Sequence, residues 1–99
     1  MNAEQKLKAR AYRLQKTYGI TLAEYDQIKA VQDGHCPICL RAKGISAPLQ
    51  VDHDHSMTGR ESVRGLLCGR DNNRLGWFEN KADRILAYLN NPPAREVLK

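Results

Sequence analysis

Two aspartates and two histidines occupy four consecutive positions near the middle of the chain, from Asp52 to His55. Carboxylate oxygens bind hard cations such as Mg²⁺ and Mn²⁺, and an imidazole can take a proton from water near neutral pH. Together with an amide oxygen such as that of Asn72, these groups suit phosphodiester hydrolysis, because the cation offsets charge on the phosphate and the base activates water. A lone histidine is more often a packed side chain, but this dense run favours the hydrolytic interpretation.

The cysteines point to a second metal ion with a structural role. Cys36 and Cys39 form a C-x-x-C pair, and Cys68 follows the histidine-rich run. The segment from Asn2 to Lys16 is strongly polar, so we expect neither a signal peptide nor a membrane span, and we expect a cytoplasmic location. Thiols stay reduced there, and the pattern then indicates zinc rather than a disulfide, with buried metal-free thiols as the alternative.

Size and charge favour a small domain with a polyanionic partner. The chain has 99 residues, and its 16 Lys and Arg against 11 Asp and Glu give a net charge of +5. A chain of this length buries a limited part of its surface, so a bound metal would help it to fold. The positive charge predicts binding to nucleic acid, although a basic surface that only aids solubility fits the composition as well. We expect no association with a membrane, because the sequence has no transmembrane run.

Periodicity and turn residues predict an α+β chain in which helices flank a β-hairpin. Thr21 and Glu24 form a capping-box pattern, which marks the start of a helix. The expected elements are, in chain order, a helix over residues 3–18, a helix after Thr21, a tight turn over 36–39, a polar loop over 41–48, strands over 49–53 and 62–67 joined by a turn over 57–60, a helix from 68–71 towards 78, and a helix over 81–90. The strand–turn–strand–helix order would bring Asp52, His53 and Asn72 around one centre.

Apolar positions on each predicted helix indicate which side chains face the core. They are Leu7, Ala11, Leu14 and Tyr18 on the first helix, Leu22, Tyr25, Ile28 and Val31 on the second, and Ile85, Leu86 and Leu89 on the last. We also expect Trp77 and Phe78 in the core rather than at bases, since the chain has few other aromatic residues. The Lys and Arg residues of the first helix are expected to form a solvated face that can also contact phosphates.

The predicted organisation has three segments within one compact domain. Residues 1–34 form an N-terminal helical segment, residues 35–79 form a zinc-stabilised core, and residues 80–99 form a C-terminal helix and tail.

Several motifs together resemble one nuclease family. They are V-D-H-D-H at 51–55, T-G at 58–59, V-R-G-L-L-C at 63–68 and N-x-x-L-G at 72–76, with Y-G-I-T-L-A-E-Y-D-Q-I and C-P-I-C upstream. This set, which extends from about Tyr18 to Leu89, resembles the recombination endonuclease VII family of bacteriophages, within the HNH or ββα-metal nucleases. The resemblance implies a small zinc-stabilised ββα-metal core with flanking helices and a metal-dependent DNA endonuclease activity.

The resemblance also implies roles for individual residues. Asp52 would bind a catalytic Mg²⁺ or Mn²⁺, His53 would be the general base, and His55 would lie close to the scissile phosphate. Asn72 takes the position of the family's asparagine, which binds the metal or orients the phosphate. The alternative is that Asn72 serves only as the N-terminal cap of the following helix. Successive side chains of a strand point to opposite faces, so Asp54 is expected on the face opposite to His53 and His55. We expect it to have a structural role or to be exposed to solvent.

The predicted zinc site departs from the family pattern at one ligand. Cys36, Cys39 and Cys68 match three of its four cysteines, and Asp71 stands where the fourth is expected. A carboxylate oxygen can bind zinc, so a site of three cysteines and Asp71 is the favoured arrangement. The alternatives are that His35 or another group completes the site, or that zinc is absent.

The expected partner is DNA, and Arg64 and Arg70 are the candidates to hold the scissile phosphate or the flanking backbone. The sequence does not decide whether the protein prefers branched DNA, or whether it cuts one strand or both. It also leaves open whether the protein is a monomer or a homodimer. A phage-encoded protein of this kind would act in the host cytoplasm. The alternative function is a non-catalytic zinc-binding phage accessory module that binds DNA or a host protein.

Overall fold

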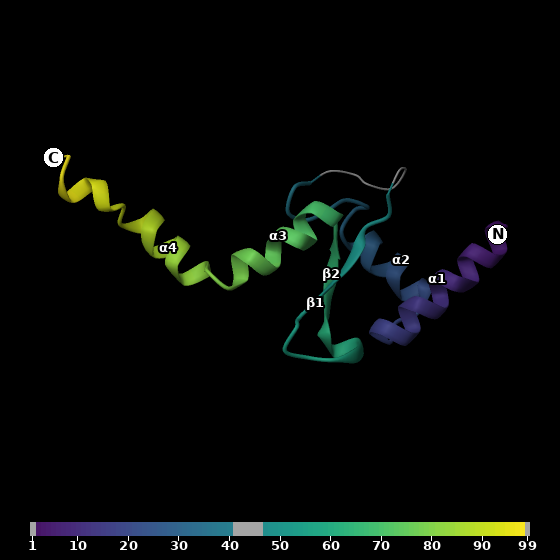
Figure 1. The fold of residues 1–99 in the computed structure, drawn as a ribbon. Coiled ribbons are helices and arrows are strands. Elements are labelled where there is room, and N and C mark those ends of the chain that lie inside the picture. Colours follow the sequence, from purple (N-terminus) through teal and green to yellow (C-terminus); the bar gives the residue numbers. More distant parts are fainter. Residues whose placement is uncertain (1, 41–46, 99) are drawn as a thin grey trace.

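The computed structural model describes residues 2–40 and 47–98, and over these residues the chain is α+β, with four α-helices and one two-stranded antiparallel sheet (Figure 1). The elements are α1 (Ala3–Tyr18), α2 (Leu22–Val31), β1 (Gln50–His53), η1 (Gly59–Ser62), β2 (Val63–Leu67), α3 (Gly69–Glu79), α4 (Ala82–Asn90) and η2 (Pro93–Glu96). The expected α+β class and the order of its elements are confirmed, and most of the predicted loop over 41–48 lies outside the described residues.

Side-chain caps set the limits of the two N-terminal helices. The Asn2 side chain accepts a hydrogen bond from the backbone N–H of Gln5, and the Asn2 backbone N–H donates one to the Gln5 side chain. Thr21 and Glu24 form the predicted capping box at the start of α2 in the same way. Gly19 ends α1 with φ of 71°, a left-handed conformation that glycine adopts without strain. The chain can therefore turn within three residues from α1 into α2.

The hairpin carries an irregularity next to the residues of chemical interest. Asp52 pairs with Gly65, whereas His53 pairs with Val63, so Arg64 is the extra residue of a β-bulge on β2. A bulge redirects the side chains around it, and here it lies beside Asp52 and His53. Residues 59–62, which were expected to end a turn and begin a strand, form the short helix η1 instead.

The core lies between the N-terminal helices, the hairpin and the start of α3. Its buried members are Leu14, Ile20, Tyr25, Cys36, Leu49, Val51, Leu66, Leu67 and Cys68. The Tyr25 hydroxyl donates to the carbonyl of Leu49 at 2.5 Å, so this large side chain is buried without leaving its polar end unsatisfied. The N-terminal helices and the hairpin thus share one core.

The Gln32 side chain forms hydrogen bonds with the main chain of Leu66, at the edge of β2 that does not face β1. Its amide donates to the Leu66 carbonyl and accepts from the Leu66 N–H, both at 2.8 Å, as a neighbouring strand would. Gly65 makes room for this contact, because a Cβ atom there would lie 3.1 Å from the Gln32 Oε1 atom. A side chain of α2's C-terminal end therefore substitutes for a third strand.

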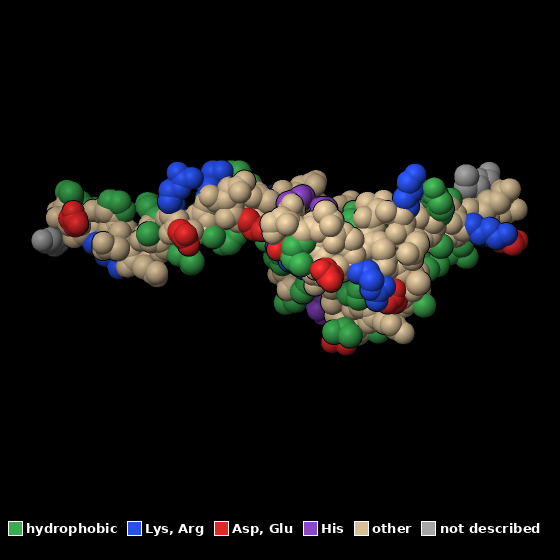
Figure 2. Space-filling view, turned by 90° about the horizontal axis from the view of Figure 1, so that it is seen from below, with side chains coloured by type: hydrophobic (Ala, Val, Ile, Leu, Met, Phe, Trp, Pro, Cys, Tyr) green, Lys and Arg blue, Asp and Glu red, His purple; other side chains and the backbone are tan. Residues whose placement is uncertain are grey.

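The molecule is elongated because its C-terminal part extends away from the core (Figures 1 and 2). The Cα radius of gyration is 17.9 Å and the extents are 64 × 28 × 24 Å, whereas a compact chain of this length has a radius near 13 Å. We call residues 77–98 the arm and the rest of the described chain the body. None of the helices in the described residues has the length and apolar content that a membrane crossing needs.

Several side chains expected in the core are exposed instead. The expectation was wrong for Trp77 and Phe78, which are 61% and 41% exposed, and for Leu86 and Leu89 of α4, which are 51% and 61% exposed. Ile85, the third residue expected to face inward, is half-buried. It was also wrong for Leu7 and Val31, which are 54% and 85% exposed. A helical repeat of apolar residues shows which side chains share a face, but it does not supply the surface that covers them.

Candidate metal cluster and hydrolytic site

The three cysteines and Asp71 come together at the corner between β2 and α3. Cys36 and Cys39 lie on the turn after α2, Cys68 caps the start of α3, and Asp71 lies in its first turn. One ligand atom from each residue lies within 4.8 Å of all the others. His35, the alternative fourth ligand, is outside this group, and its ring nitrogen lies 3.3 Å from the Cys36 carbonyl.

The spacing of these donor atoms fits a tetrahedral ion. The Cys39 and Cys68 sulfurs are 3.8 Å apart, and the Cys36 sulfur is 3.3 Å from Asp71 Oδ2. A tetrahedral zinc site with Zn–S bonds of about 2.3 Å spaces two sulfurs about 3.8 Å apart and a sulfur and an oxygen about 3.5 Å apart. The cluster could therefore hold a metal ion such as zinc without large rearrangement.

Burial and hydrogen bonds change the acidity of the cluster. Burial raises the pKa of the Cys68 thiol to about 11. Burial acts in the same direction on Cys36, but N–H groups of Cys39, Cys68 and Ile38 point at its sulfur and lower its pKa overall. The surrounding thiols donate to the carboxylate of Asp71 and lower its pKa, so this residue is a ready anionic ligand.

Asp52, a buried residue of β1, forms an ion pair with Arg64, whose side chain is 35% exposed. The guanidinium donates to both carboxylate oxygens at 2.9 Å, and it also reaches the two oxygens of Glu79 near the end of α3. Hydrogen bonds to Glu79 and Asp52 raise the pKa of Arg64, and the same contact lowers the pKa of Glu79. Arg64, predicted to hold a phosphate, is in this structure held by two carboxylates.

Asn72 faces the same side of β1 as Asp52. Its side-chain amide donates to Gln50 Oε1 at 3.2 Å, and Gln50 lies two positions before Asp52, so the two strand residues share a face. Gly69 allows this approach, because a Cβ atom there would lie 3.0 Å from the Gln50 amide nitrogen. The N-cap of α3 is Cys68. The alternative hypothesis, in which Asn72 is only the cap of this helix, is therefore wrong.

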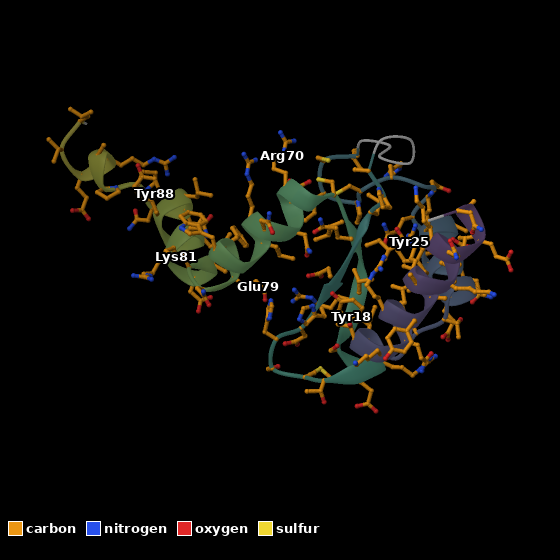
Figure 3. All side chains as sticks on the ribbon, turned by 45° about the vertical axis from the view of Figure 1, so that its right-hand side comes forward. Tyr18, Tyr25, Arg70, Glu79, Lys81 and Tyr88 are labelled. Atoms are coloured by element: carbon orange, nitrogen blue, oxygen red, sulfur yellow. The ribbon has the colours of Figure 1, made fainter. Side chains whose placement is uncertain are left out.

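His53 and His55 form an aromatic group with Tyr18 of α1. The ring centres of the two histidines are 4.4 Å apart, and the His53 ring is 5.6 Å from the Tyr18 ring. His53 is half-buried and His55 is exposed, so water can reach this pair. Figure 3 shows Tyr18 between α1 and the hairpin.

The remaining predicted residues have simpler surroundings. Asp54 accepts hydrogen bonds from the backbone and hydroxyl of Ser56, which lower its pKa and hold the turn after β1, in line with the predicted structural role. Arg70 is exposed at the start of α3 (Figure 3).

Three residues of the site region were not singled out from the sequence. Tyr18, which contacts His53, was assigned to the core. Glu79 lies 15 positions from its partner Arg64, and Gln50 lies 22 positions from its partner Asn72. For Gln50, the sequence did contain a signal: side chains two positions apart on a strand share a face, so Gln50 lies on the same face of β1 as Asp52.

Comparison with known proteins identifies the family. The model of the recombination endonuclease VII family matches residues 11–91. The chain belongs to the recombination endonuclease VII family. This confirms the resemblance stated on the sequence motifs, and it extends the matching region into α1.

Relatives come from mycobacteriophages. The "Gene 59 protein" of Mycobacterium phage L5 is 49% identical over 90 residues, which cover 87% of this chain and 53% of the relative. The protein of the same description from Mycobacterium phage D29 is 47% identical with the same coverage. The chain thus spans about half the length of the curated relatives it matches. No solved structure matches the chain.

Proposed function

We propose that this chain is a metal-dependent endonuclease of the HNH type that hydrolyses phosphodiester bonds in DNA. Membership of the recombination endonuclease VII family supports the reaction class. The observation that carries the proposal is the position of α3, whose first turns hold both a member of the cysteine cluster and Asn72 beside the face of β1 that bears Asp52. A hairpin followed by a helix, with a metal cluster at their corner, is the framework such a site needs.

The cysteine cluster would hold zinc as a structural ion. Cys36, Cys39, Cys68 and Asp71 supply three soft sulfurs and one oxygen, all at least partly buried. Because Cys68 also begins α3, metal binding would hold the first turn of the helix and hence Asn72. The predicted core of residues 35–79 would be the unit that this ion stabilises.

The hydrolytic part of the site would use three side chains directly. Asp52 and Asn72 offer hard oxygen donors for Mg²⁺ or Mn²⁺, and such a cation would offset the charge that develops on the phosphate oxygens. His53 would take a proton from the attacking water, and its half-buried ring beside His55 and Tyr18 restricts its orientation. His55, Arg64 and Arg70 would contact the phosphate group.

The test is cleavage of supercoiled plasmid and of a four-way junction by zinc-loaded protein with Mg²⁺ or Mn²⁺. His53→Ala should lower the cleavage rate by about 10²- to 10⁴-fold, the usual contribution of a general base, while DNA affinity changes little. His35→Ala is the matched control, because that histidine lies outside the site, and it should cut at the wild-type rate. Equal losses in both variants would contradict the general-base role. The ratio of junction to plasmid cleavage reports any preference for branched DNA.

One observation favours a second candidate, a non-catalytic zinc-binding module that binds DNA or a host protein. Both oxygens of Asp52 already accept hydrogen bonds from Arg64, so a cation would have to compete for them. If folded, zinc-loaded protein binds DNA but cuts neither substrate, this second candidate replaces the first.

A further inference from the structure

An open groove lies between α1 and β1, next to the proposed hydrolytic site, with which it shares Asn72. It has a volume of about 490 Å³, and α1 contributes Arg10, Arg13, Thr17 and Tyr18 to its wall. Gln50 of β1 and Asn72 of α3 line the opposite side. Two of its lining residues, Tyr18 and Tyr25, are labelled in Figure 3.

The charge of this wall is strongly positive. α1 carries five basic residues and one acidic residue, which accounts for most of the net charge of the chain. Within residues 2–40 and 47–98, neither Arg10 nor Arg13 forms an ion pair, whereas Lys8, Arg60 and Arg64 do. The guanidinium of Arg10 lies 4.5 Å from the centre of the Tyr25 ring, which holds it at the groove without neutralising it.

The groove connects directly with residues of the proposed function. Asn72 lines it, and Tyr18 both lines it and contacts the His53 ring. A chain of phosphates that entered past Arg13 would therefore arrive beside the residues proposed to act on a phosphodiester.

Three consecutive residues around the start of β1, Leu49 to Val51, also line the groove, and β1 has one edge that does not face β2. Among the described residues no strand pairs with this edge, while the opposite edge of the sheet is closed at Leu66 by Gln32. Backbone N–H groups, arginines and a threonine hydroxyl are the donors that hold phosphates in protein–DNA contacts. Among the residues that the structure describes, the lining holds no acidic side chain, which favours a polyanion over a peptide strand as occupant.

We propose that this groove binds the sugar-phosphate backbone of a DNA strand, with Arg10 and Arg13 contacting phosphates next to the one that is cleaved. The proposal rests on the proposed function for the identity of the ligand. It adds a binding surface on the N-terminal helix to a site otherwise built from the hairpin and α3.

The experiment measures DNA affinity at several salt concentrations with zinc-loaded, full-length protein. All variants carry His53→Ala so that the labelled duplex stays intact. Arg13→Gln should weaken binding by about 5- to 10-fold near 0.1 M salt and should reduce the slope of log K against log salt by about 0.9, the value for one lost phosphate contact. Lys16→Gln is the matched control, because it removes the same charge from the same helix outside the groove, and it should weaken binding less than twofold. Arg10→Lys keeps the charge and should retain most of the affinity.

The outcomes separate this proposal from the proposed function. If Arg13→Gln and Lys16→Gln weaken binding equally, the groove proposal is overturned and only general charge attraction remains. If the chain with an intact His53 cuts DNA, and Arg13→Gln changes neither affinity nor kcat/KM, the nuclease stands and the groove fails. If DNA is bound with the expected Arg13 dependence but never cut, the groove stands and the nuclease fails. A chain that binds no DNA overturns both.

Discussion

The body and the arm contain helices of similar length and pattern, yet their apolar side chains meet opposite environments. On α2, Tyr25 is 3% exposed, because this face packs against α1 and β2. On α4, Tyr88 and Leu89 are each 61% exposed, and no residue of the helix is buried. Figure 2 shows this difference as a thick body and a narrow arm.

What distinguishes the two regions is contact between segments that are far apart in sequence. In the body, the cysteine cluster joins the turn after α2 to the start of α3, and Gln32 joins α2 to β2. In the arm, Glu79 pairs with Arg64 where α3 leaves the body, whereas the backbone hydrogen bonds at both ends of α4 are local. The stability of the body should therefore depend on a few long-range links, and the arm should tolerate substitution. Four substitution experiments test this contrast.

The largest effect is expected at the cysteine cluster. Cys68→Ser should abolish cooperative thermal unfolding and most of the helical signal in circular dichroism. Structural zinc contributes about 10–16 kcal/mol of apparent binding free energy in small zinc peptides, which exceeds the total stability of most domains of this size. Asp71→Cys is the informative counterpart, since a fourth thiolate should raise zinc affinity in a competition with a chelator. A Cys68→Ser protein that melts at the wild-type temperature would refute the structural-ion hypothesis.

The second effect compares one leucine from each region. Leu66 is completely buried, and Leu66→Ala should lower the free energy of unfolding by about 2–5 kcal/mol through lost burial and a cavity. Leu89→Ala makes the same chemical change at a side chain that is 61% exposed, and its effect should stay within about 0.5 kcal/mol. Urea denaturation of the zinc-loaded proteins measures both values. Equal losses would mean that the arm is buried in solution.

A smaller effect is expected from the Gln32 side chain. Gln32→Leu has a similar volume but leaves the N–H and C=O of Leu66 without partners, which should cost about 1–3 kcal/mol. The amide proton of Leu66 should also exchange faster with solvent in this variant, and hydrogen exchange measured by NMR checks this. Unchanged protection at Leu66 would mean that the Gln32 contact is not maintained in solution.

The smallest effect is pH-dependent and concerns the link between η1 and α2. Arg60 donates to Glu24, and this contact, together with the Thr21 N–H, lowers the pKa of the Glu24 carboxyl from 4.5 to about 2. Because the pKa is lower in the folded state, Glu24 favours folding above about pH 4.5, and this contribution is lost as the pH falls towards 2. Glu24→Gln should flatten the dependence of the melting temperature on pH in that window. Arg60→Gln should flatten it in the same way, and an unchanged slope in both would contradict the assignment.

Local features of the fold were predictable because their causes are local. Thr21 and Glu24 mark the start of α2 by pairing across one turn, and Gly19 ends α1 by its own conformation. The cysteine cluster was also foreseen, since C-x-x-C followed by Cys68 indicates metal ligands and the family resemblance puts Asp71 at the fourth ligand position. The structure brings all four residues together.

Long-range features were not predictable from periodicity. The two hydrogen bonds between Gln32 and Leu66 span 34 positions, and nothing in the segment around Gln32 marks it as a partner for a strand. The pairing of Arg64 with Asp52 depends on the β-bulge that makes Arg64 the extra residue. The exposure of Leu86 and Leu89 depends on which surfaces come near α4, and a helical repeat carries no information about that.

The contact between Gln32 and Leu66 also bears on self-association of the hairpin. An unpaired strand edge is a template for aggregation, and a two-stranded ribbon normally has two such edges. Here Gln32 occupies the main-chain groups in the middle of β2 and interrupts the run that a strand from another copy would need. Among the described residues, the edge of β1 that does not face β2 is then the one left for a further strand, and addition of a second copy there would pair two molecules. The Gln32 side chain thus makes extension of the sheet past β2 less favourable.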